Sequence, residues 1–314
     1  MIMNLHRALE RQVGKVIVGQ SEALRLVLIA LVCEGHVLLE GVPGLAKTTL
    51  VRAVAAALGL KFGRIQFTPD LMPSDIVGTQ IFSFQSGTFH LVEGPVFTNV
   101  MLGDEINRAP AKTQSALLEA MQERQVSIDG KARPLPAPFM VLATQNPVEQ
   151  EGTYPLPEAQ LDRFLFKIAL TYPTLEEELR ILEQHRGDTA GLSALLAAIE
   201  VVGGVAELAA AREEAMRVQI RPEVAEYLVR LVRRTRDHTQ IQLGGSPRAA
   251  LLLQLAARAA AAMEGREYAI PDDVKELFVP ALRHRIVLTA SAEVDGVGAD
   301  EVLRGLVEST PVPR

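Results

Sequence analysis

The feature of this sequence that most constrains its fold is an alternation of five short apolar runs with segments of helical periodicity, between about residues 36 and 170. Each run is too short for an independent helix and is rich in Val, Leu, Ile and Phe, which is typical of strands buried on both faces of a parallel sheet. The runs span residues 36–40, 62–67, 97–103, 139–144 and 164–170. The alternation therefore predicts an α/β domain with a five-stranded parallel sheet covered by helices.

Beyond about residue 173 the sequence changes character, because strand-like runs disappear and Leu and Ala recur at helical spacing. Three segments place a proline where a first helical residue has no use for its missing N–H: Arg221-Pro222-Glu223, Ser246-Pro247-Arg248 and Ile270-Pro271-Asp272. This part is predicted to be an all-helical domain. Gly187-Asp188 marks the clearest break, so we expect an α/β core over residues 1–187 and a helical domain over residues 188–314.

Composition and charge exclude several classes of protein. The 314 residues are 48% hydrophobic, and no stretch approaches the ~20 uninterrupted apolar residues of a membrane helix, so we expect a globular protein with no membrane span. The first residues lack the basic start and apolar block of a secretion signal, which favours a cytoplasmic protein. A formal net charge of −6 disfavours nucleic acid as the main partner. The single cysteine, Cys33, is expected to be a packing residue.

The stretch GVPGLAKTT follows the first apolar run and precedes a helical pattern, which is the context of a phosphate-binding loop. Such a loop needs glycines so that successive backbone N–H groups can surround an anion, a Lys that reaches the outer phosphates, and a hydroxyl for a magnesium ion. The candidate nucleotide-binding residues are Gly41, Val42, Pro43, Gly44, Leu45, Ala46, Lys47, Thr48 and Thr49.

One position of this loop departs from the general pattern, because Ala46 stands where a Gly usually precedes the Lys. A methyl group at positive φ costs about 1 kcal/mol or more, so Ala is acceptable at this position only if its φ is negative. On its own the stretch could also be a Gly-Pro turn between a strand and a helix.

Two adjacent acids, Asp104 and Glu105, end the third apolar run at the carboxyl edge, where α/β sheets place their ligands. The first can hold a metal ion, and the second can orient and deprotonate an attacking water. Paired acids at a strand end also cap helices. Because they occur together with a phosphate loop, we interpret Thr48 and Asp104 as metal ligands and Glu105 as the catalytic base.

Three further polar residues are placed to contact a phosphate. Asn146 follows the fourth apolar run and could steer the water or sense the γ-phosphate, although an Asn before Pro147 also simply turns the chain. Arg163 directly precedes the last apolar run and Arg248 lies in the first turn of a helix, so both guanidinium groups are expected to be fixed. A guanidinium donates two bonds at once to a phosphate. An ordinary surface ion pair is the alternative for either arginine.

The ordered motifs resemble those of AAA+ ATPases, and their wording is similar to the MoxR branch of that family. The matching segments are GVPGLAKT, GDEINRAP, ATQNP, LPEAQLDRF and SPRA, and the resemblance as a whole covers nearly the whole chain. The resemblance implies a P-loop core followed by a helical lid, with ATP and Mg²⁺ as cofactors. It also implies that Val18 and Gly19, in the Val-Gly-Gln element before the first strand, belong to an adenine pocket.

The resemblance implies a role for each remaining candidate. Lys47 and Thr48 would bind phosphate and magnesium, and Asp104 would support the metal. Glu105 would activate water, and Asn146 would be the first sensor. Arg163 would be an arginine finger that acts on the nucleotide of the neighbouring subunit. Arg248 would be the second sensor, which reaches from the lid to the nucleotide of its own subunit.

The activity implied by the resemblance is ATP hydrolysis in a hexameric ring, coupled to chaperone-like maturation, remodelling or metal-insertion assistance of a partner protein complex. The implied partners are other copies of the chain and a protein client, which can carry a von Willebrand factor A domain. Two other classes stay open. A nucleic-acid motor of the helicase-related AAA+ group is disfavoured by the acidic balance, and a nucleotide-gated scaffold without useful turnover is disfavoured by Glu105, Asn146 and the two arginines.

Two predicted β-hairpins place the chain within AAA+ proteins. Residues 81–91 alternate three phenylalanines around a Ser-Gly pair, and residues 125–133 alternate Val126 and Ile128 before an Asp-Gly turn. The resemblance assigns both to insertions shared with magnesium chelatase and replicative-helicase relatives, where they line the pore of the ring or face clients. Alternatively, each is a surface hairpin whose apolar side covers the core.

Overall fold

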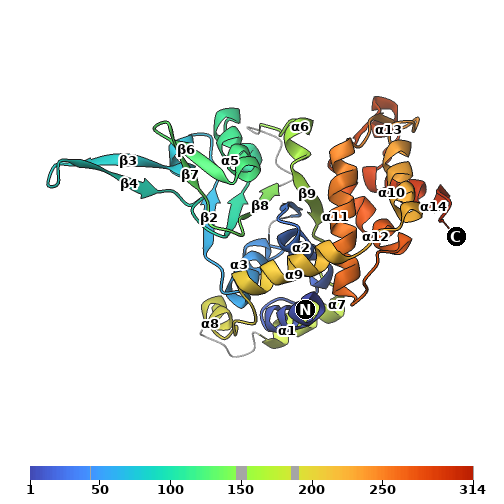
Figure 1. Ribbon diagram of the computed structural model, residues 1–314, viewed down its shortest axis with the longest axis horizontal. Helices are drawn as coiled ribbons and strands as arrows, with labels where there is room; N and C mark the ends of the chain where they lie inside the picture. Colours follow the sequence, from blue (N-terminus) through green and yellow to red (C-terminus); the bar gives the residue numbers. More distant parts are fainter. Residues whose placement is uncertain (43, 146–153, 185–190, 314) are drawn as a thin grey trace.

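The structure, a computed structural model of the chain, describes residues 1–42, 44–145, 154–184 and 191–313. Its central element is a five-stranded parallel sheet in the order β2-β5-β8-β1-β9, which confirms the predicted α/β fold (Figure 1). The strands are β1 (His36–Glu40), β2 (Phe62–Gln66), β5 (Val100–Asp104), β8 (Met140–Gln145) and β9 (Phe164–Ala169). The third predicted run starts too early, because residues 97–99 form a bend before β5.

Both faces of the sheet are buried, as its apolar strands require. Along β1, Val37 and Leu39 belong to one hydrophobic core and Leu38 to the other. The first core includes the helices α1 (Ile2–Val13), α2 (Ser21–Val32) and α3 (Lys47–Ala57). The second includes α4 (Pro73–Val77) and α5 (Ala111–Glu123). The sheet is thus held rigidly between two helical layers, so its carboxyl edge is a fixed platform for ligands.

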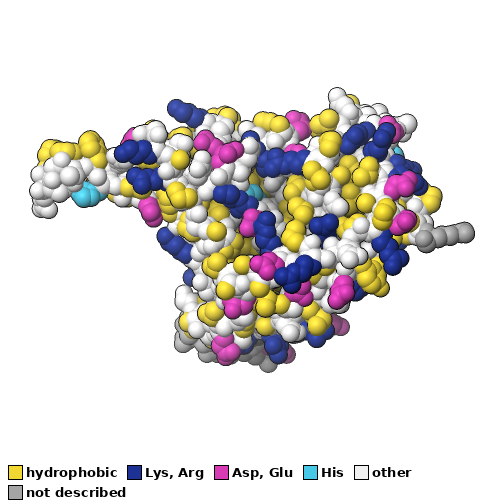
Figure 2. Space-filling view, viewed as in Figure 1, with side chains coloured by type: hydrophobic (Ala, Val, Ile, Leu, Met, Phe, Trp, Pro, Cys, Tyr) yellow, Lys and Arg dark blue, Asp and Glu magenta, His cyan; other side chains and the backbone are white. Residues whose placement is uncertain are grey.

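The first predicted hairpin projects from the body of the molecule as β3 (Gly78–Ser83) and β4 (Thr88–Glu93) (Figure 1). Its aromatic side chains face solvent, since Phe82, Phe84 and Phe89 are 41%, 92% and 65% exposed. The ring of Phe82 contacts those of Phe84 and Phe89 edge to face, at centroid distances of 5.2 and 5.1 Å. Figure 2 shows the hydrophobic side chains gathered at the far end. The alternative that this hairpin covers the core is therefore wrong.

The second predicted hairpin is β6 (Gln125–Ile128) and β7 (Lys131–Pro134), which follow α5. Here Val126 and Ile128 are 2% and 5% exposed and belong to the second core. For this hairpin the apolar side does cover the core. Two similar sequence patterns therefore form one buried and one exposed apolar face.

The C-terminal part of the chain is helical, as predicted, apart from a two-stranded ribbon that the sequence analysis missed because each strand is too short to show alternation. The three proline-led starts are confirmed, since Pro222, Pro247 and Pro271 are the first residues of their helices. The elements are α9 (Val205–Arg217), α10 (Pro222–Arg234), β10 (Ile241–Leu243), α11 (Pro247–Met263), α12 (Pro271–Leu282), β11 (Val287–Leu288), α13 (Ala290–Val294) and α14 (Ala299–Ser309).

This helical lid is attached along the β9 edge of the sheet. Helices α11 and α12 pack against β9, while α9 packs against α1, α2 and α11. The connecting elements are η1 (Ile106–Arg108), α6 (Glu158–Leu161), α7 (Leu175–Gln184) and α8 (Gly191–Ala197). The predicted boundary after residue 187 falls outside the described residues and stays a prediction. Within the described ranges, no helix is both long and apolar enough to cross a membrane.

Two buried histidines join parts of the core in their neutral form. His36 accepts a hydrogen bond at Nδ1 from the Val141 N–H and donates from Nε2 to the Met121 carbonyl, both at 3.0 Å. His284 donates from Nε2 to the Phe164 carbonyl at 2.9 Å. Burial lowers the pKa of His36 to about 3 and lowers the pKa of His284 well below 6.5.

Mild acid is therefore expected to destabilise the fold. Below about pH 6.5 the unfolded chain binds more protons than the folded chain, so the free energy of unfolding falls by about 1.4 kcal/mol per pH unit for each histidine. Urea titrations between about pH 6.5 and about pH 4.5 measure this slope. The variant His90→Asn, which alters an exposed ring, should keep it. A midpoint that does not change across this range would contradict the prediction.

Candidate active site

The carboxyl ends of β1, β5 and β8 lie level with one another and bring the candidate residues to one edge of the sheet. Glu40 at the end of β1 is in register with Gln145 at the end of β8, and Gly103 in β5 is in register with Ala143 in β8. The phosphate loop follows β1 directly, and the two acids end β5 and begin the next turn. Residues that lie far apart in the sequence are thus collected on the side where parallel sheets bind ligands.

The loop after β1 has the backbone of an anion-binding turn that opens into a helix. Gly44 has a φ of +89°, and a Cβ built there would meet no atom within 4 Å, so the loop is open on that side. Helix α3 begins at Lys47, which directs the free N–H groups of its first turn toward the loop. The Lys47 Nζ donates to the Gly41 carbonyl at 2.6 Å, so this ammonium extends across the loop. Pro43 lies outside the described residues.

The condition that the sequence set for Ala46, a negative φ, is not met, because its φ is +56°. The residue precedes the first turn of α3 and has a left-handed conformation, which an L-residue adopts at a cost of about 1–2 kcal/mol. The sequence rule considered only the local cost of the methyl group. In the folded protein the conformation is imposed by the route of the loop from β1 into α3, and backbone strain of this kind is concentrated at ligand sites.

Electrostatics link Lys47 to the acids. Burial lowers the pKa of Lys47, and the negative charges of Asp104, Glu105 and Glu40 oppose that shift. Glu40 is itself paired with Lys167 at 2.8 Å. The ammonium of Lys47 therefore lies within electrostatic range of the carboxylates of Asp104 and Glu105, and their joint action on one ligand stays a prediction.

Asp104 is a nearly buried carboxylate with partners on two neighbouring strands. Its Oδ2 accepts from Arg64 Nε on β2 at 2.7 Å, and its Oδ1 accepts from Thr144 Oγ1 on β8 at 3.3 Å. The side chain of Asp104 is 10% exposed, whereas that of Arg64 is 51% exposed. The carboxylate is thus oriented by the sheet, while its basic partner can move toward solvent.

Glu105 is held in place by its backbone and by its carboxylate. Its φ is +57°, and its N–H donates to Thr144 Oγ1 at 2.9 Å. The Oε2 atom accepts from Gln66 Nε2 at 2.7 Å and pairs with Arg108 at 3.1 Å. Such a turn is unusual for a residue other than Gly, and it directly precedes the short helix η1. The alternative that the acids cap that helix is not supported, because no side-chain cap is found at Glu105.

Three residues that orient the acids were missed from the sequence: Arg64, Gln66 and Thr144. The signal that could have found them is strand register, because Gln66 is paired with Asp104 across β2 and β5. That register is a tertiary property, and neither arginine nor glutamine in a strand is distinctive by itself.

An apolar cavity of about 320 Å³ adjoins the phosphate loop. Val18 lines it beside Gly44 and Thr49, and the role of Val18 in an adenine pocket stays a prediction. Gly19 lies next to it with a φ of +79°, and a Cβ there would be 2.7 Å from the carboxyl carbon of Glu177, so a Gly is required for α7 to approach. The lining residues are Val16, Ile17, Val18, Gln20, Gly44, Leu45, Ala46, Thr49, Pro173, Ile181 and Leu192. A planar, weakly polar base fits such walls.

The structure places Arg163 at the amino ends of the strands, on the opposite side of the sheet from the carboxyl ends, where the phosphate loop lies. It precedes Phe164, which is paired with His36 at the start of β1, whereas the loop follows Glu40 at the end of β1. The six residues of β9 separate the two edges by about 20 Å. Arg163 is half-buried, and no hydrogen-bond partner of its guanidinium is found among the described residues. It cannot reach the loop of its own chain.

Arg248 lies at this same opposite edge, which corrects the expectation that it reaches the nucleotide of its own subunit. Ser246, two residues earlier, donates to the carboxylate of Asp162 at 3.1 Å. The charge of Arg248 also contributes to the lowered pKa of His36, at the start of β1. The sequence could not predict the position of Arg248, because tertiary packing determines where the lid contacts the sheet. Asn146 lies outside the described residues.

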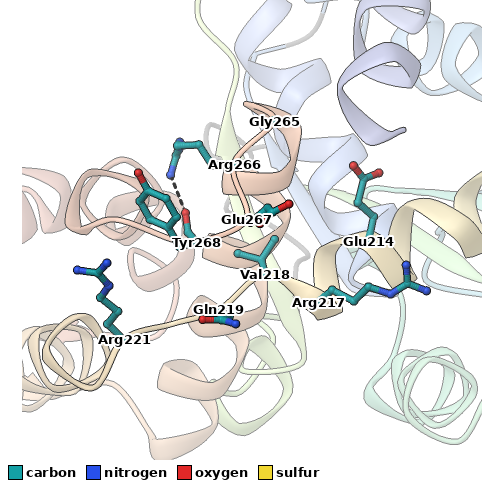
Figure 3. Close-up of a pocket in the computed structure, with 9 residues that line it drawn as sticks. All are labelled: Glu214, Arg217, Val218, Gln219, Arg221, Gly265, Arg266, Glu267 and Tyr268. Atoms are coloured by element: carbon teal, nitrogen blue, oxygen red, sulfur yellow. Dashed lines mark hydrogen bonds between the residues drawn. The ribbon is translucent and has the colours of Figure 1, made fainter.

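A larger cavity, of about 540 Å³, lies elsewhere in the lid and is not part of this site (Figure 3). Its most prominent side chains are already engaged. Arg266 pairs with Asp273 through two bonds of 2.5 and 2.7 Å, and Arg221 lies over the Tyr268 ring at 5.8 Å. None of the candidate residues that the structure describes at the phosphate-loop site lines this cavity.

Comparison with known proteins gives a consistent result. Residues 36–166 match the model of the ATPase family associated with various cellular activities (AAA), and residues 233–306 match an AAA lid domain. The uncharacterized protein YeaC of Bacillus subtilis is 45% identical over 98% of this chain and 95% of its own length. Chaperone MoxR1 of Mycobacterium tuberculosis is 45% identical over 96% and 81%. A putative ATPase from Cytophaga hutchinsonii has a similar crystal structure, with a TM-score of 0.91, 42% identity and coverage of 100% and 96%.

Proposed function

Because the chain belongs to the MoxR branch of the AAA+ ATPases, we propose that it hydrolyses ATP as a hexameric ring and uses the cycle to mature or remodel a partner protein complex. The observation that carries this proposal is the separation of the phosphate loop from Arg163 and Arg248 by the length of β9. Each subunit holds a binding site and, at the far edge, the positive charges that such a site requires. A ring of identical subunits brings the two edges together at every interface.

The binding residues divide by the part of the substrate that they would contact. The apolar cavity beside Val18 would accept the base, and the N–H groups of the loop with Lys47 would hold the phosphates. Thr48 and Asp104 provide the oxygen ligands that a magnesium ion prefers, and the ion would neutralise phosphate charge. The residues fit this cofactor, because the Asp104 carboxylate is oriented by Thr144 and its basic partner is half exposed.

Hydrolysis would need a base on one side of the terminal phosphate and positive charge around it. Glu105 would take a proton from the attacking water, with its carboxylate held by Gln66 and Arg108. Arg163 and Arg248 of the neighbouring subunit would stabilise the negative charge that develops in the transition state. Asn146 would help to orient the water.

The β3–β4 hairpin supports the assignment of a protein partner. Three clustered aromatic rings in water are unfavourable in isolation, and such exposed patches mark interaction sites. Assistance with metal insertion and a partner that carries a von Willebrand factor A domain are the forms of this function that we propose. The acidic net charge of the chain argues against nucleic acid as that partner.

The experiment that tests this function uses a purified von Willebrand factor A domain protein from the same genome. With ATP and the Glu105→Gln form, which should retain nucleotide, we expect the partner to bind. Replacing Phe82, Phe84 and Phe89 together by Ser should weaken binding by at least about tenfold, since each buried ring contributes about 1 kcal/mol or more. The control Val294→Ser removes another exposed apolar side chain, 86% exposed on α13, and should have no effect. Equal binding by the hairpin variant would contradict the proposed contact.

A further inference from the structure

A buried arginine from the lid holds the segment that carries Arg163. Arg285 follows α12, and its side chain is 1% exposed. Its Nε donates to Asp162 Oδ1 at 2.8 Å, and its Nη2 donates to the carbonyls of Asp162 and Phe164 at 3.1 and 2.5 Å. These two residues are the immediate neighbours of Arg163 in the chain.

Every N–H group of the Arg285 guanidinium donates a hydrogen bond. Its Nη1 donates to the Leu165 carbonyl at 3.1 Å and also to the Ala281 carbonyl on α12. An arginine has five N–H donors in a fixed planar fork, and here each donor has its own acceptor. Four of the five acceptors lie in residues 162–165, so the orientation of the backbone at Arg163 is set by a group from the lid.

Asp162 connects the hydrogen bonds of Arg285 to the helix that carries Arg248. Its carboxylate accepts from Arg285 and also from Ser246 Oγ, at 3.1 and 3.2 Å to its two oxygens. Ser246 is the N-cap of α11 and accepts from the Ala249 N–H at 3.1 Å. Arg248 lies in the first turn of that helix. One carboxylate thus fixes the backbone before Arg163 and the helix start that carries Arg248.

Stability alone does not account for this arrangement. Burial lowers the pKa of Arg285, and the attraction of Asp162 opposes that effect. A buried ion pair of this kind is often no more stable than apolar side chains of similar size, and it is retained where one arrangement must be specified. Here the arrangement that it specifies is the relative position of two arginines on one exposed edge.

We propose that Asp162 and Arg285 are positioning residues for catalysis in the neighbouring subunit, because they lock Arg163 and Arg248 into one rigid pair. This inference rests on the proposed ring-forming ATPase and adds the device that sets the geometry of its interface. Asp162 and Arg285 touch neither nucleotide nor water in this scheme. They act only through the two arginines.

The main test compares Asp162→Asn with the wild-type ring. A displacement of about 1 Å in a catalytic group can lower the rate about 10²-fold, so we expect kcat to fall about 10²-fold while KM changes less than about twofold. The dissociation constant of a fluorescent non-hydrolysable ATP analogue should be unchanged, because the phosphate loop lies at the other edge. Arg285→Lys, which keeps the charge and loses the fork, should show the same pattern.

Mixed rings locate the defect. Asp162→Asn subunits have intact phosphate loops, and Lys47→Ala subunits have intact arginines. In an equimolar mixture about a quarter of the interfaces should combine the two intact halves and regain wild-type turnover. A merely structural loss in Asp162→Asn would not be repaired by a neighbour.

Matched controls separate positioning from stability. Asp273→Asn breaks another largely buried arginine–aspartate pair of the lid, Arg266–Asp273, which does not contact residues 162–165, and should leave kcat unchanged. If Asp162→Asn does not fold, Ser246→Ala replaces it. Its control is Thr289→Ala, which removes a comparable N-cap from α13 and does not touch Asp162. Unfolding curves are measured for every variant.

The outcomes distinguish this inference from the function on which it rests. If Arg163→Ala has no effect on turnover, the proposed ring chemistry is wrong. If Arg163→Ala abolishes turnover while a folded Asp162→Asn or Ser246→Ala ring keeps wild-type kcat, the positioning role is overturned. It is also overturned if Asp162→Asn loses activity that Lys47→Ala subunits do not restore.

Discussion

Replacing Glu105 by Gln is expected to lower ATP turnover about 10²–10⁴-fold while leaving nucleotide binding intact, which is the range that a general base contributes. The amide cannot accept the proton of the attacking water, yet it is nearly the same size as the carboxylate. Gln66 and Thr144, which hold Glu105 in the structure, remain in place. Turnover is measured by phosphate release, and binding by equilibrium titration with labelled ATP.

The matched control for this variant is Glu93→Gln, which changes an exposed carboxylate at the end of β4. It should leave turnover within about twofold of wild type, as surface substitutions usually do. If Glu105→Gln retains most of the wild-type turnover, another group must activate the water. If it loses nucleotide binding instead, the residue acts on the ground state and not as a base.

Replacing Arg163 by Ala is expected to lower turnover about 10³–10⁵-fold, the range measured for arginine fingers. The physical reason is the position of Arg163 at the start of β9, about 20 Å from its own phosphate loop, from where it can stabilise charge only in an adjoining subunit. Phosphate release per subunit and the population of rings by ultracentrifugation are measured together, because loss of assembly would also lower turnover.

Mixed assemblies give this prediction its sharpest form. Arg163→Ala subunits retain intact phosphate loops, and Lys47→Ala subunits retain intact arginines. Each population alone should be nearly inactive, and an equimolar mixture should recover about a quarter of wild-type turnover. If Arg163 acts within its own subunit, the mixture stays inactive. That result would remove the argument for a ring.

The parts of the fold that the sequence predicted are those encoded locally. The five apolar runs became the five strands of the sheet, and the loop before Lys47 has the strand-to-helix context that its glycines indicate. The three prolines at Pro222, Pro247 and Pro271 each begin a helix, because their missing N–H is harmless only in the first turn.

The parts that could not be predicted depend on register and on packing between domains. Gln66 holds Glu105 because β2 and β5 pair in one particular register, and nothing near Gln66 in the sequence specifies that partner. The sign of φ at Ala46 follows from the path of the whole loop. The placement of Arg248 depends on where the lid meets β9, and the resemblance of the motif to its family could not supply that orientation.

The two hairpins are a further case in which tertiary structure could not be predicted from the sequence pattern. Alternating apolar residues correctly predicted both hairpins, but alternation does not indicate which part of the protein the apolar face packs against. Val126 and Ile128 pack into the second core with α5. The rings of Phe82, Phe84 and Phe89 instead pack against one another in solvent. Only the direction in which each pair of strands leaves the body decides between the two outcomes.

The projecting β3–β4 hairpin has a consequence for how strongly a partner must be held. In the ring that we propose, the same aromatic tip would be repeated around the axis, so a client could engage several tips at once. Affinity then arises from avidity, in which each contact can be weak and quickly reversible while the whole attachment persists. Such an attachment would allow one tip to be released while the remaining tips keep the client bound.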